Sequence, residues 1–162
     1  MKNKILVISS LIIVILFVLS MMSCNNSPST TTADGNKTLI THLTAAEFKD
    51  KIFDYTSSND FKYKGTEPCI IDFYATWCGP CKRIAPVLED LSVEYKGKIK
   101  IYKIDVDQEK DLAGAFGVES IPTIYFCPLG GKPRIEYGAI PKENLVEIIN
   151  TTLLHNSITK TN

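Results

Sequence analysis

The stretch "IIDFYATWCGPCKRIAP", from Ile70 to Pro86, joins a run of apolar residues to a pair of cysteines. Its first half is almost continuously apolar and of strand length, a pattern typical of a central strand that is covered on both faces. Asp72 is the one charged residue of that strand. A carboxylate placed there loses its hydration, so burial is expected to raise the pKa of Asp72 toward the range that suits a general base.

Cys78 and Cys81 follow this strand, with Gly79-Pro80 between them. Apolar residues then recur at helical spacing as far as Tyr95, which predicts a helix that starts near Cys81 and ends before Gly97. Unpaired N–H groups and the positive end of the helix dipole stabilise a thiolate at such a start, so the pKa of Cys78 is expected to fall toward neutrality. Cys81, one turn into the helix, would then attack a mixed disulfide formed on Cys78.

A Cys-x-x-Cys pair has three interpretations: half of a zinc site, a redox disulfide, or two thiols incidental to the core. A structural zinc site needs four ligands, commonly from two such pairs or from one pair and histidines. This chain has one pair, and His42 and His155 fall in a predicted strand and in the tail. The ligand count therefore disfavours a metal, and the redox interpretation is the one with a mechanism.

The patterns on either side predict one α/β domain. "TLITHL" is typical of a strand, and Thr44 with Glu47 forms a capping box that opens a helix to about Phe53. Further elements are predicted as a strand in "KIKIYKIDV", a short helix in "EKDLAGAFG", strands in "PTIYFCP" and "PRIEYG", and an amphipathic helix around Leu145 to Leu153. This order predicts a central mixed sheet, with parallel strands and a C-terminal antiparallel hairpin, flanked by helices.

The motif "WCGPC", Trp77 to Cys81, resembles the active-site motif of thioredoxins. The resemblance extends from Thr38 to about Leu154, because "HLTAAEF", "KIDVDQ", "GVESIPTIYF", "GGK" and "YGAI" occur in the order of thioredoxin's own segments. It implies a thioredoxin fold and a monomeric protein-disulfide reductase that needs no cofactor and no metal.

The resemblance also implies roles for single residues. Asp72 matches the buried aspartate that accepts or relays the proton of the resolving thiol, here Cys81. Lys103 matches a lysine near that aspartate, although the alternation of its strand equally allows a solvated edge residue. Pro122 in "SIPT" matches a cis-proline that faces the reactive thiol. The rim on which substrates dock would comprise Trp77, Gly79, Pro80, Ile121, Pro122, Gly138 and Ala139.

Some positions depart from the family pattern. Tyr74 stands where thioredoxins often have tryptophan, and Ser120 replaces a common glycine. These departures bear on substrate preference and on the midpoint potential, and leave the reaction class unchanged. Trp77 lies next to a thiol expected to be solvent-accessible, which indicates a recognition surface rather than simple packing.

The N-terminus has the order of an export signal over residues 1–23. Lys2 and Lys4 precede an apolar run, which ends in small and polar residues. Cys24 then resembles the processing site of bacterial lipoproteins, whose thiol is acylated after cleavage, although Met21 stands where leucine is usual. An uncleaved transmembrane anchor and a soluble secreted form are the alternatives.

The export signal divides the chain into three parts. Residues 24–37 would hold the lipidated cysteine and a flexible linker, and residues 38–162 the thioredoxin-like domain. Each form of the N-terminus, lipidated, anchored or secreted, places that domain outside the cytoplasm, in the periplasm, and the two with an N-terminal attachment tether it to a membrane.

Cys69 and Cys127 remain after these assignments. The family fold implies that the strand ending at Tyr74 runs antiparallel to the one starting at Pro122, with Tyr74 opposite Pro122. Five residues before Tyr74 is Cys69, and five residues after Pro122 is Cys127, so the two cysteines would lie opposite each other. Directly opposed strand residues have β-carbons about 4.5–5.5 Å apart, farther than the roughly 3.8 Å of a usual disulfide. Two buried free thiols are therefore favoured over a second bridge.

The functional hypothesis is an exported protein-disulfide reductase. Its substrates would be exported proteins with disulfides, and a membrane electron-transfer protein would supply electrons, because such compartments are kept oxidising. An exported oxidase or isomerase is the alternative, and a redox-inactive binding module of the same fold is disfavoured by the retained Cys78, Cys81, Asp72 and Pro122. The chain has 18 basic and 18 acidic residues, and the basic ones form no cluster, so no nucleic-acid partner is expected.

Overall fold

The computed structural model describes residues 39–58 and 60–155. The predicted export signal over residues 1–23 and the segment 24–37 with its lipidation site Cys24 lie outside the described residues. Within the described part of the chain, no helix has both the length and the hydrophobicity that a membrane span requires.

A mixed sheet forms the centre of the domain, with strand order β1-β3-β2-β4-β5. Its strands are β1 (Ile40–His42), β2 (Cys69–Tyr74), β3 (Lys100–Asp105), β4 (Thr123–Cys127) and β5 (Arg134–Tyr137). Both β1 and β2 run parallel to β3, whereas β4 is antiparallel to β2 and to β5. The prediction of parallel strands followed by an antiparallel hairpin is confirmed, and the apolar strand that precedes the cysteines is the central one.

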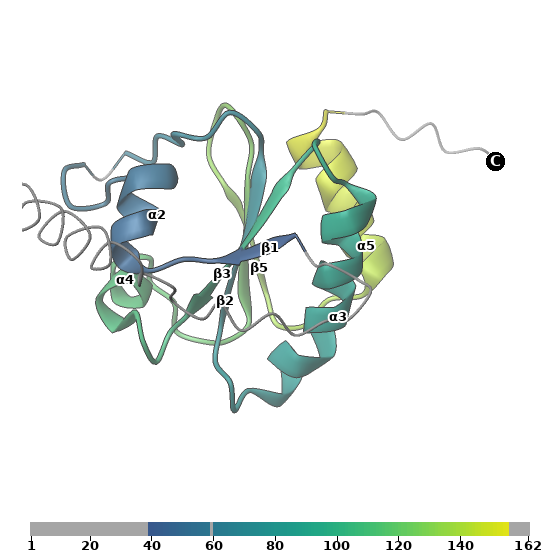
Figure 1. Ribbon diagram of the computed structural model, residues 1–162, viewed down its shortest axis with the longest axis horizontal. Coiled ribbons are helices and arrows are strands. Elements are labelled where there is room, and N and C mark those ends of the chain that lie inside the picture. Colours follow the sequence, from purple (N-terminus) through teal and green to yellow (C-terminus); the bar gives the residue numbers. More distant parts are fainter. Residues whose placement is uncertain (1–38, 59, 156–162) are drawn as a thin grey trace, which may run out of the picture. The chain divides into compact units, whose positions relative to one another are not determined.

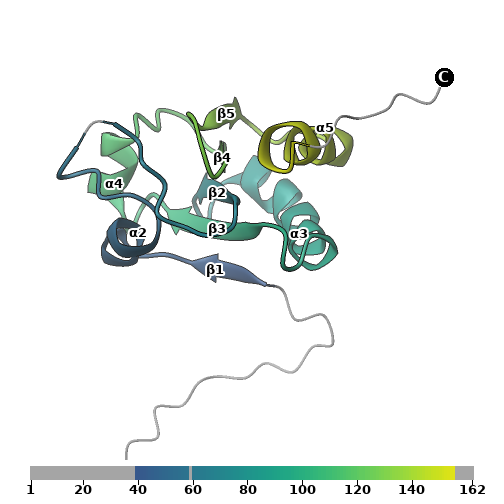
Figure 2. The same cartoon turned by 90° about the horizontal axis from the view of Figure 1, so that it is seen from above.

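Helices cover both faces of this sheet, as Figure 1 shows with the sheet seen nearly edge-on. The helices are α2 (Ala45–Lys51), α3 (Gly79–Glu94), α4 (Lys110–Ala115) and α5 (Lys142–Ile148), which continues as the wider π-helical turn η1 (Ile149–Leu153). One face carries α2 and α4, and the other carries α3 and α5 (Figures 1 and 2). This layered α/β arrangement is the thioredoxin fold that the sequence predicts.

The helix ends follow local signals in the sequence. At the start of α2, Thr44 Oγ1 accepts a hydrogen bond from Glu47 N, and Glu47 Oε2 accepts one from Thr44 N at 3.1 Å, so the capping box is present. That helix ends at Lys51, slightly earlier than expected. Gly117 follows α4 with φ of +62°, a left-handed conformation that glycine adopts without a steric penalty.

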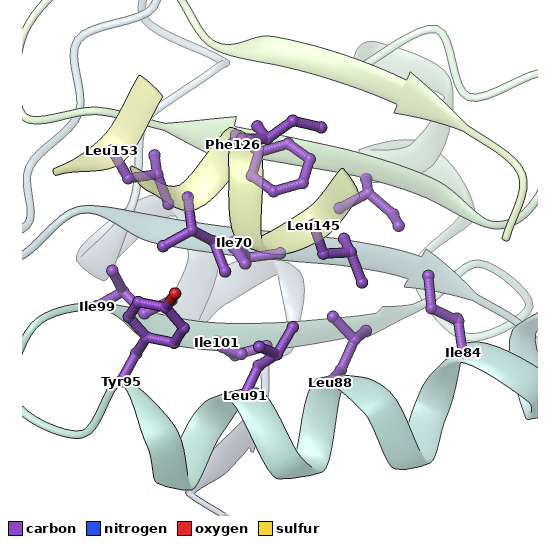
Figure 3. Close-up of a cluster of buried hydrophobic side chains, with 13 residues drawn as sticks. Ile70, Ile84, Leu88, Leu91, Tyr95, Ile99, Ile101, Phe126, Leu145 and Leu153 are labelled. Carbon is purple, nitrogen blue, oxygen red and sulfur yellow. The ribbon is translucent and has the colours of Figure 1, made fainter. Parts of the chain in front are cut away.

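Two hydrophobic cores lie on the two faces of the sheet, because successive strand residues point to opposite sides. Ile70 packs into the core beneath α3 and α5, whereas its neighbour Ile71 packs into the core beneath α2 and α4. Figure 3 shows the first core, in which α3 supplies Leu88 and Leu91 and the C-terminal helix supplies Leu145. Asp72 shares the face of Ile70, so its carboxylate is buried together with the apolar side chains of this strand.

Two of the cysteines outside the Cys-x-x-Cys motif, Cys69 and Cys127, are direct neighbours. Cys69 pairs with Cys127 in the β2–β4 register, as counting from the active site predicts. Both are free thiols with no exposed surface. The hydrogen bond with Cys69, and then burial, raise the pKa of Cys127 well above its ordinary value, which keeps this thiol protonated and unreactive.

We therefore expect Cys69 and Cys127 to react slowly with thiol reagents in the native protein and to form no second disulfide. In the oxidised full-length chain carrying Cys24→Ser, which removes the fifth cysteine, a thiol reagent should titrate none rapidly at pH 8 and two after denaturation. The native resistance follows from complete burial, and the count of two from the separation of opposed strand residues. A count of zero in denaturant would instead establish a Cys69–Cys127 disulfide.

Candidate active site

Cys78 and Cys81 form a disulfide at the point where β2 gives way to α3. Cys78 is the N-cap of α3, and its sulfur accepts the backbone N–H of Cys81 at 3.1 Å. Pro80 occupies the first turn, where its missing N–H costs nothing. When the disulfide is opened, the same N–H group and the helix dipole are placed to stabilise negative charge on the Cys78 sulfur.

The disulfide is more enclosed than the sequence suggests. Cys78 is 3% exposed and Cys81 2% exposed, and both pack with Ala75 and Ile121. The expectation of a solvent-accessible first thiol is therefore wrong for the oxidised form. The adjacent Trp77 is 68% exposed, so its indole is an accessible apolar surface next to the disulfide.

A loop before β4 lies against the first cysteine. The Ile121–Pro122 peptide bond is cis, as the resemblance implies, and the Ile121 carbonyl oxygen lies 3.8 Å from the Cys78 sulfur. Gly138 N donates to the Pro122 carbonyl at 2.7 Å, and the φ of Gly138 is +79°. The hydroxyl of Thr123 donates to the Ser120 carbonyl at 2.6 Å. These bonds bring the predicted rim residues Ile121, Pro122 and Gly138 to one edge beside Cys78, and the outer rim positions Gly79, Pro80 and Ala139 are exposed.

The exposed Trp77 is held by a residue that sequence reasoning missed. Its indole Nε1 donates to Asp107 Oδ2 at 2.7 Å, which fixes one edge of the ring. Asp107 lies just after β3, within the segment "KIDVDQ" that resembles thioredoxin. The signal was its place after a parallel strand next to the one that leads to the cysteines, because such strands end at the same edge of the sheet.

Asp72 is completely buried and pairs with Lys103 in the register of β2 and β3. Lys103 Nζ lies 3.3 Å from Asp72 Oδ2, and the side chain of Lys103 is only 10% exposed, so the interpretation of Lys103 as a solvated edge residue is wrong. Among the described residues, neither oxygen of Asp72 accepts a hydrogen bond of good geometry. Loss of hydration raises the pKa of Asp72, and the Lys103 ammonium opposes this rise without cancelling it.

Two further residues surround Lys103 and were not predicted. The Lys103 ammonium lies over the ring of Tyr74, 4.3 Å from its centroid. The Tyr74 hydroxyl in turn meets Nδ1 of His42 at 3.2 Å. Tyr74 is one of the departures from the family pattern, and the structure shows that its hydroxyl has a partner.

The site as a whole is a redox dithiol. It has a nucleophilic sulfur at a helix start, a second sulfur one turn away, a cis-proline loop against the first sulfur and a buried carboxylate in the adjoining strand. Within residues 39–58 and 60–155, no group of three or more potential ligands is placed to hold a metal. These features define the class of thiol–disulfide oxidoreductases.

Comparisons with known proteins give the family. Residues 40–151 match the family model described as Thioredoxin. The thioredoxin of Borreliella burgdorferi is 45% identical over 107 residues, which cover 66% of this chain and 92% of that protein. The thioredoxin of Bacillus subtilis is 50% identical over 84 residues, covering 52% and 81%. The crystal structure of chloroplastic thioredoxin z is similar with a TM-score of 0.58 at 30% identity, covering 69% and 92%.

The chain belongs to the thioredoxin family. It is a disulfide oxidoreductase with a Cys78–Cys81 redox pair, and reduction of protein disulfides is the activity that its homologues indicate.

Proposed function

We propose that this thioredoxin reduces disulfides of exported proteins outside the cytoplasm, from a position on a membrane to which an acylated Cys24 attaches it. The observation that carries the chemistry is the position of the Cys78 sulfur, which caps α3 and lies beside the Ile121 carbonyl and the cis Pro122. The export-type sequence of residues 1–23 supports the location.

The reaction begins with the reduced protein. The Cys78 thiolate attacks one sulfur of the partner's disulfide; that S–S bond breaks, and the partner's other sulfur leaves as a thiolate. Cys81, once deprotonated, then attacks the Cys78 sulfur of the mixed disulfide and releases the second partner thiol. The partner gains two electrons, and the protein ends with the Cys78–Cys81 disulfide that the structure holds.

Asp72 is the proposed acceptor of the Cys81 proton. It is the buried carboxylate of the strand that leads to the cysteines, and desolvation moves its pKa upward, toward the range of a general base. Among the described residues, no hydrogen bond joins Asp72 to Cys81, so a bridging water would carry the proton from the thiol. Lys103 would stabilise the carboxylate once it has ionised.

Substrates would dock as extended segments on the rim around Cys78. Trp77 offers an exposed apolar face, the backbone carbonyl of Ile121 lies beside the sulfur, and Ala139 is exposed next to Gly138. Partners of this kind are proteins with accessible disulfides. Regeneration of the dithiol outside the cytoplasm requires a membrane electron-transfer protein that passes two electrons to the Cys78–Cys81 disulfide.

Redox equilibration against glutathione tests the direction of electron flow. We expect a midpoint potential near the about −270 mV typical of thioredoxins, because Gly-Pro between the cysteines resembles reductants. A potential near the about −120 mV of a strong oxidase would overturn the reductase and favour the alternative of an exported oxidase. For this two-electron couple, about 30 mV corresponds to about 1.4 kcal/mol, so the two outcomes are well separated.

Acyl labelling tests the attachment. In cells fed a labelled fatty acid, we expect the wild-type chain to carry label and to sediment with membranes, and the Cys24→Ser chain to lose the label. Unlabelled chains that both stay in the membrane fraction would indicate an uncleaved anchor. A wild-type chain recovered in the soluble exported fraction would exclude both tethered forms.

A further inference from the structure

A row of polar side chains crosses three neighbouring strands near the active site. His42 on β1, Lys103 on β3 and Asp72 on β2 are consecutive partners in the sheet register. Directly paired residues project from the same face of a sheet, so imidazole, ammonium and carboxylate lie side by side. Tyr74 lies two residues beyond Asp72 on β2 and therefore belongs to the same face.

Tyr74 connects the outer member of this row to the middle one. Its hydroxyl lies 3.2 Å from His42 Nδ1, and the two rings meet edge to face with centroids 5.8 Å apart. The Lys103 ammonium lies 4.3 Å from the centre of the same tyrosine ring and 3.3 Å from Asp72 Oδ2. Lys103 thus lies between a π face and a carboxylate, and the hydroxyl of that aromatic ring contacts His42.

The Lys103 side chain borders a cavity that contains two other carboxylates. A surface cavity of about 360 Å³ is lined by His42, Tyr74 and Lys103 and opens toward solvent. Its other charged members are Asp105, from β3, and Glu109, which immediately precedes α4 and whose carboxylate accepts the N–H of Ala45. Lysine has a long flexible stem, so without the tyrosine ring Nζ could turn from Asp72 toward these carboxylates.

The protonation state of His42 agrees with this arrangement. Burial, and then the positive charge of Lys103, lower the pKa of His42, whereas Asp105 opposes the change. The ring is therefore neutral at neutral pH, and the tautomer with its proton on Nε2 leaves Nδ1 free to accept the Tyr74 hydroxyl proton.

We propose that His42 and Tyr74 are positioning residues that hold the Lys103 ammonium against Asp72 and so tune how readily this carboxylate takes the proton of Cys81. The inference rests on the proposed role of Asp72 as proton acceptor. Tyr74 packs against the cluster of Ala75, Cys78 and Cys81. Among the described residues, no hydrogen bond joins His42 or Tyr74 to either sulfur, and both residues act through Lys103.

The test uses the full-length protein and variants that loosen this arrangement step by step. Tyr74→Phe removes the hydroxyl and keeps the ring, His42→Leu removes the acceptor, and Tyr74→Leu removes the ring. His42→Asn is the rescue variant, because its amide oxygen occupies roughly the place of Nδ1. Tyr102→Phe is the matched control, since the neighbouring tyrosine on β3 faces the opposite core.

Two measurements are made on each variant. The first is the titration of the Asp72 carboxyl carbon by ¹³C NMR, with the signal assigned by Asp72→Asn, and dispersed spectra also verify folding. The second is the rate at which the mixed disulfide is resolved, as a function of pH. We expect the Asp72 midpoint to move to higher pH in Tyr74→Phe, His42→Leu and Tyr74→Leu, and the rate below that midpoint to fall about two- to fivefold.

The outcomes separate the positioning role of His42 and Tyr74 from the proposed role of Asp72 as proton acceptor. An Asp72 midpoint that rises in the three loosening variants, returns in His42→Asn and stays at the wild-type value in Tyr102→Phe supports the positioning role. An unchanged midpoint in folded His42→Leu and Tyr74→Leu overturns it. A midpoint that moves while the rate profile does not follow it would leave the positioning of Lys103 established and reject Asp72 as the acceptor of the Cys81 proton.

Discussion

Replacement of Cys78 by alanine is expected to abolish disulfide reduction and to leave the domain folded. Covalent catalysis that loses its nucleophile falls by roughly 10³-fold or more, and Cys81 cannot take over because it is 2% exposed and lies one turn inside the helix. The measurement is the rate of reduction of a protein disulfide by the reduced variant, with the fold verified by circular dichroism.

The cost to stability should be small and should have a local origin. The Cys78 sulfur caps α3 by accepting the Cys81 N–H at 3.1 Å, and loss of such a cap costs about 1 kcal/mol. Cys78→Ser supplies a hydroxyl that can accept the same N–H, so it should be inactive but closer to the reduced wild-type protein in its free energy of unfolding.

Cys81→Ser is the matched control for mechanism. This variant keeps the nucleophile and lacks the resolving thiol, so it should accumulate a mixed disulfide with its substrate that a reductant releases. Cys78→Ala should trap nothing. Retained turnover in Cys78→Ala, or trapping by that variant through Cys81, would contradict the assignment of Cys78 as the attacking thiol.

The sequence predicted the fold because its patterns are local and strong. The continuous apolar run of β2, the alternation of β3 and the capping box of Thr44 each specify an element without reference to the rest of the chain. The Cys69–Cys127 pairing was also predictable, since one anchored pair in an antiparallel ladder fixes every other pair by counting.

What escaped prediction depends on side chains that meet across separate elements. Tyr74 and His42 are 32 residues apart and lie on strands separated by β3, so no pattern along the chain brings them together. The contact of Trp77 with Asp107 has the same character. The enclosure of Cys78 also follows from tertiary packing, because the loop around Ile121 covers it only when β4 lies beside β2.

Replacement of Asp72 by asparagine should slow the reaction and stabilise the fold. Asparagine has the shape of a protonated aspartate but cannot accept the Cys81 proton, so resolution of the mixed disulfide should slow by about 10²-fold at neutral pH, at the low end of general-base effects. The mixed disulfide should persist correspondingly longer, which quenched-flow trapping with an alkylating reagent measures. Resolution at the wild-type rate would reject Asp72 as the base.

The gain in stability has a predictable pH dependence. Burial raises the folded-state pKa of Asp72 above its unfolded value, for which the ordinary value is about 3.9. Stabilisation by the neutral carboxyl is fully present below that unfolded value and is lost as the pH rises through the folded-state pKa, because the unfolded chain ionises first. Each unit of the upward shift corresponds to about 1.4 kcal/mol at pH values above both pKa values.

Urea unfolding of the oxidised protein at several pH values measures this effect. Asp72→Asn and wild type should have similar free energies of unfolding near pH 3.5, and the variant should become the more stable protein as the pH rises toward 8. Lys103→Met is the opposing control, because removal of the ammonium 3.3 Å from Asp72 raises the pKa of the carboxyl further and should destabilise the protein at pH 8. If Asp72→Asn were instead less stable than wild type at pH 8, the ion pair with Lys103 would outweigh the desolvation of Asp72.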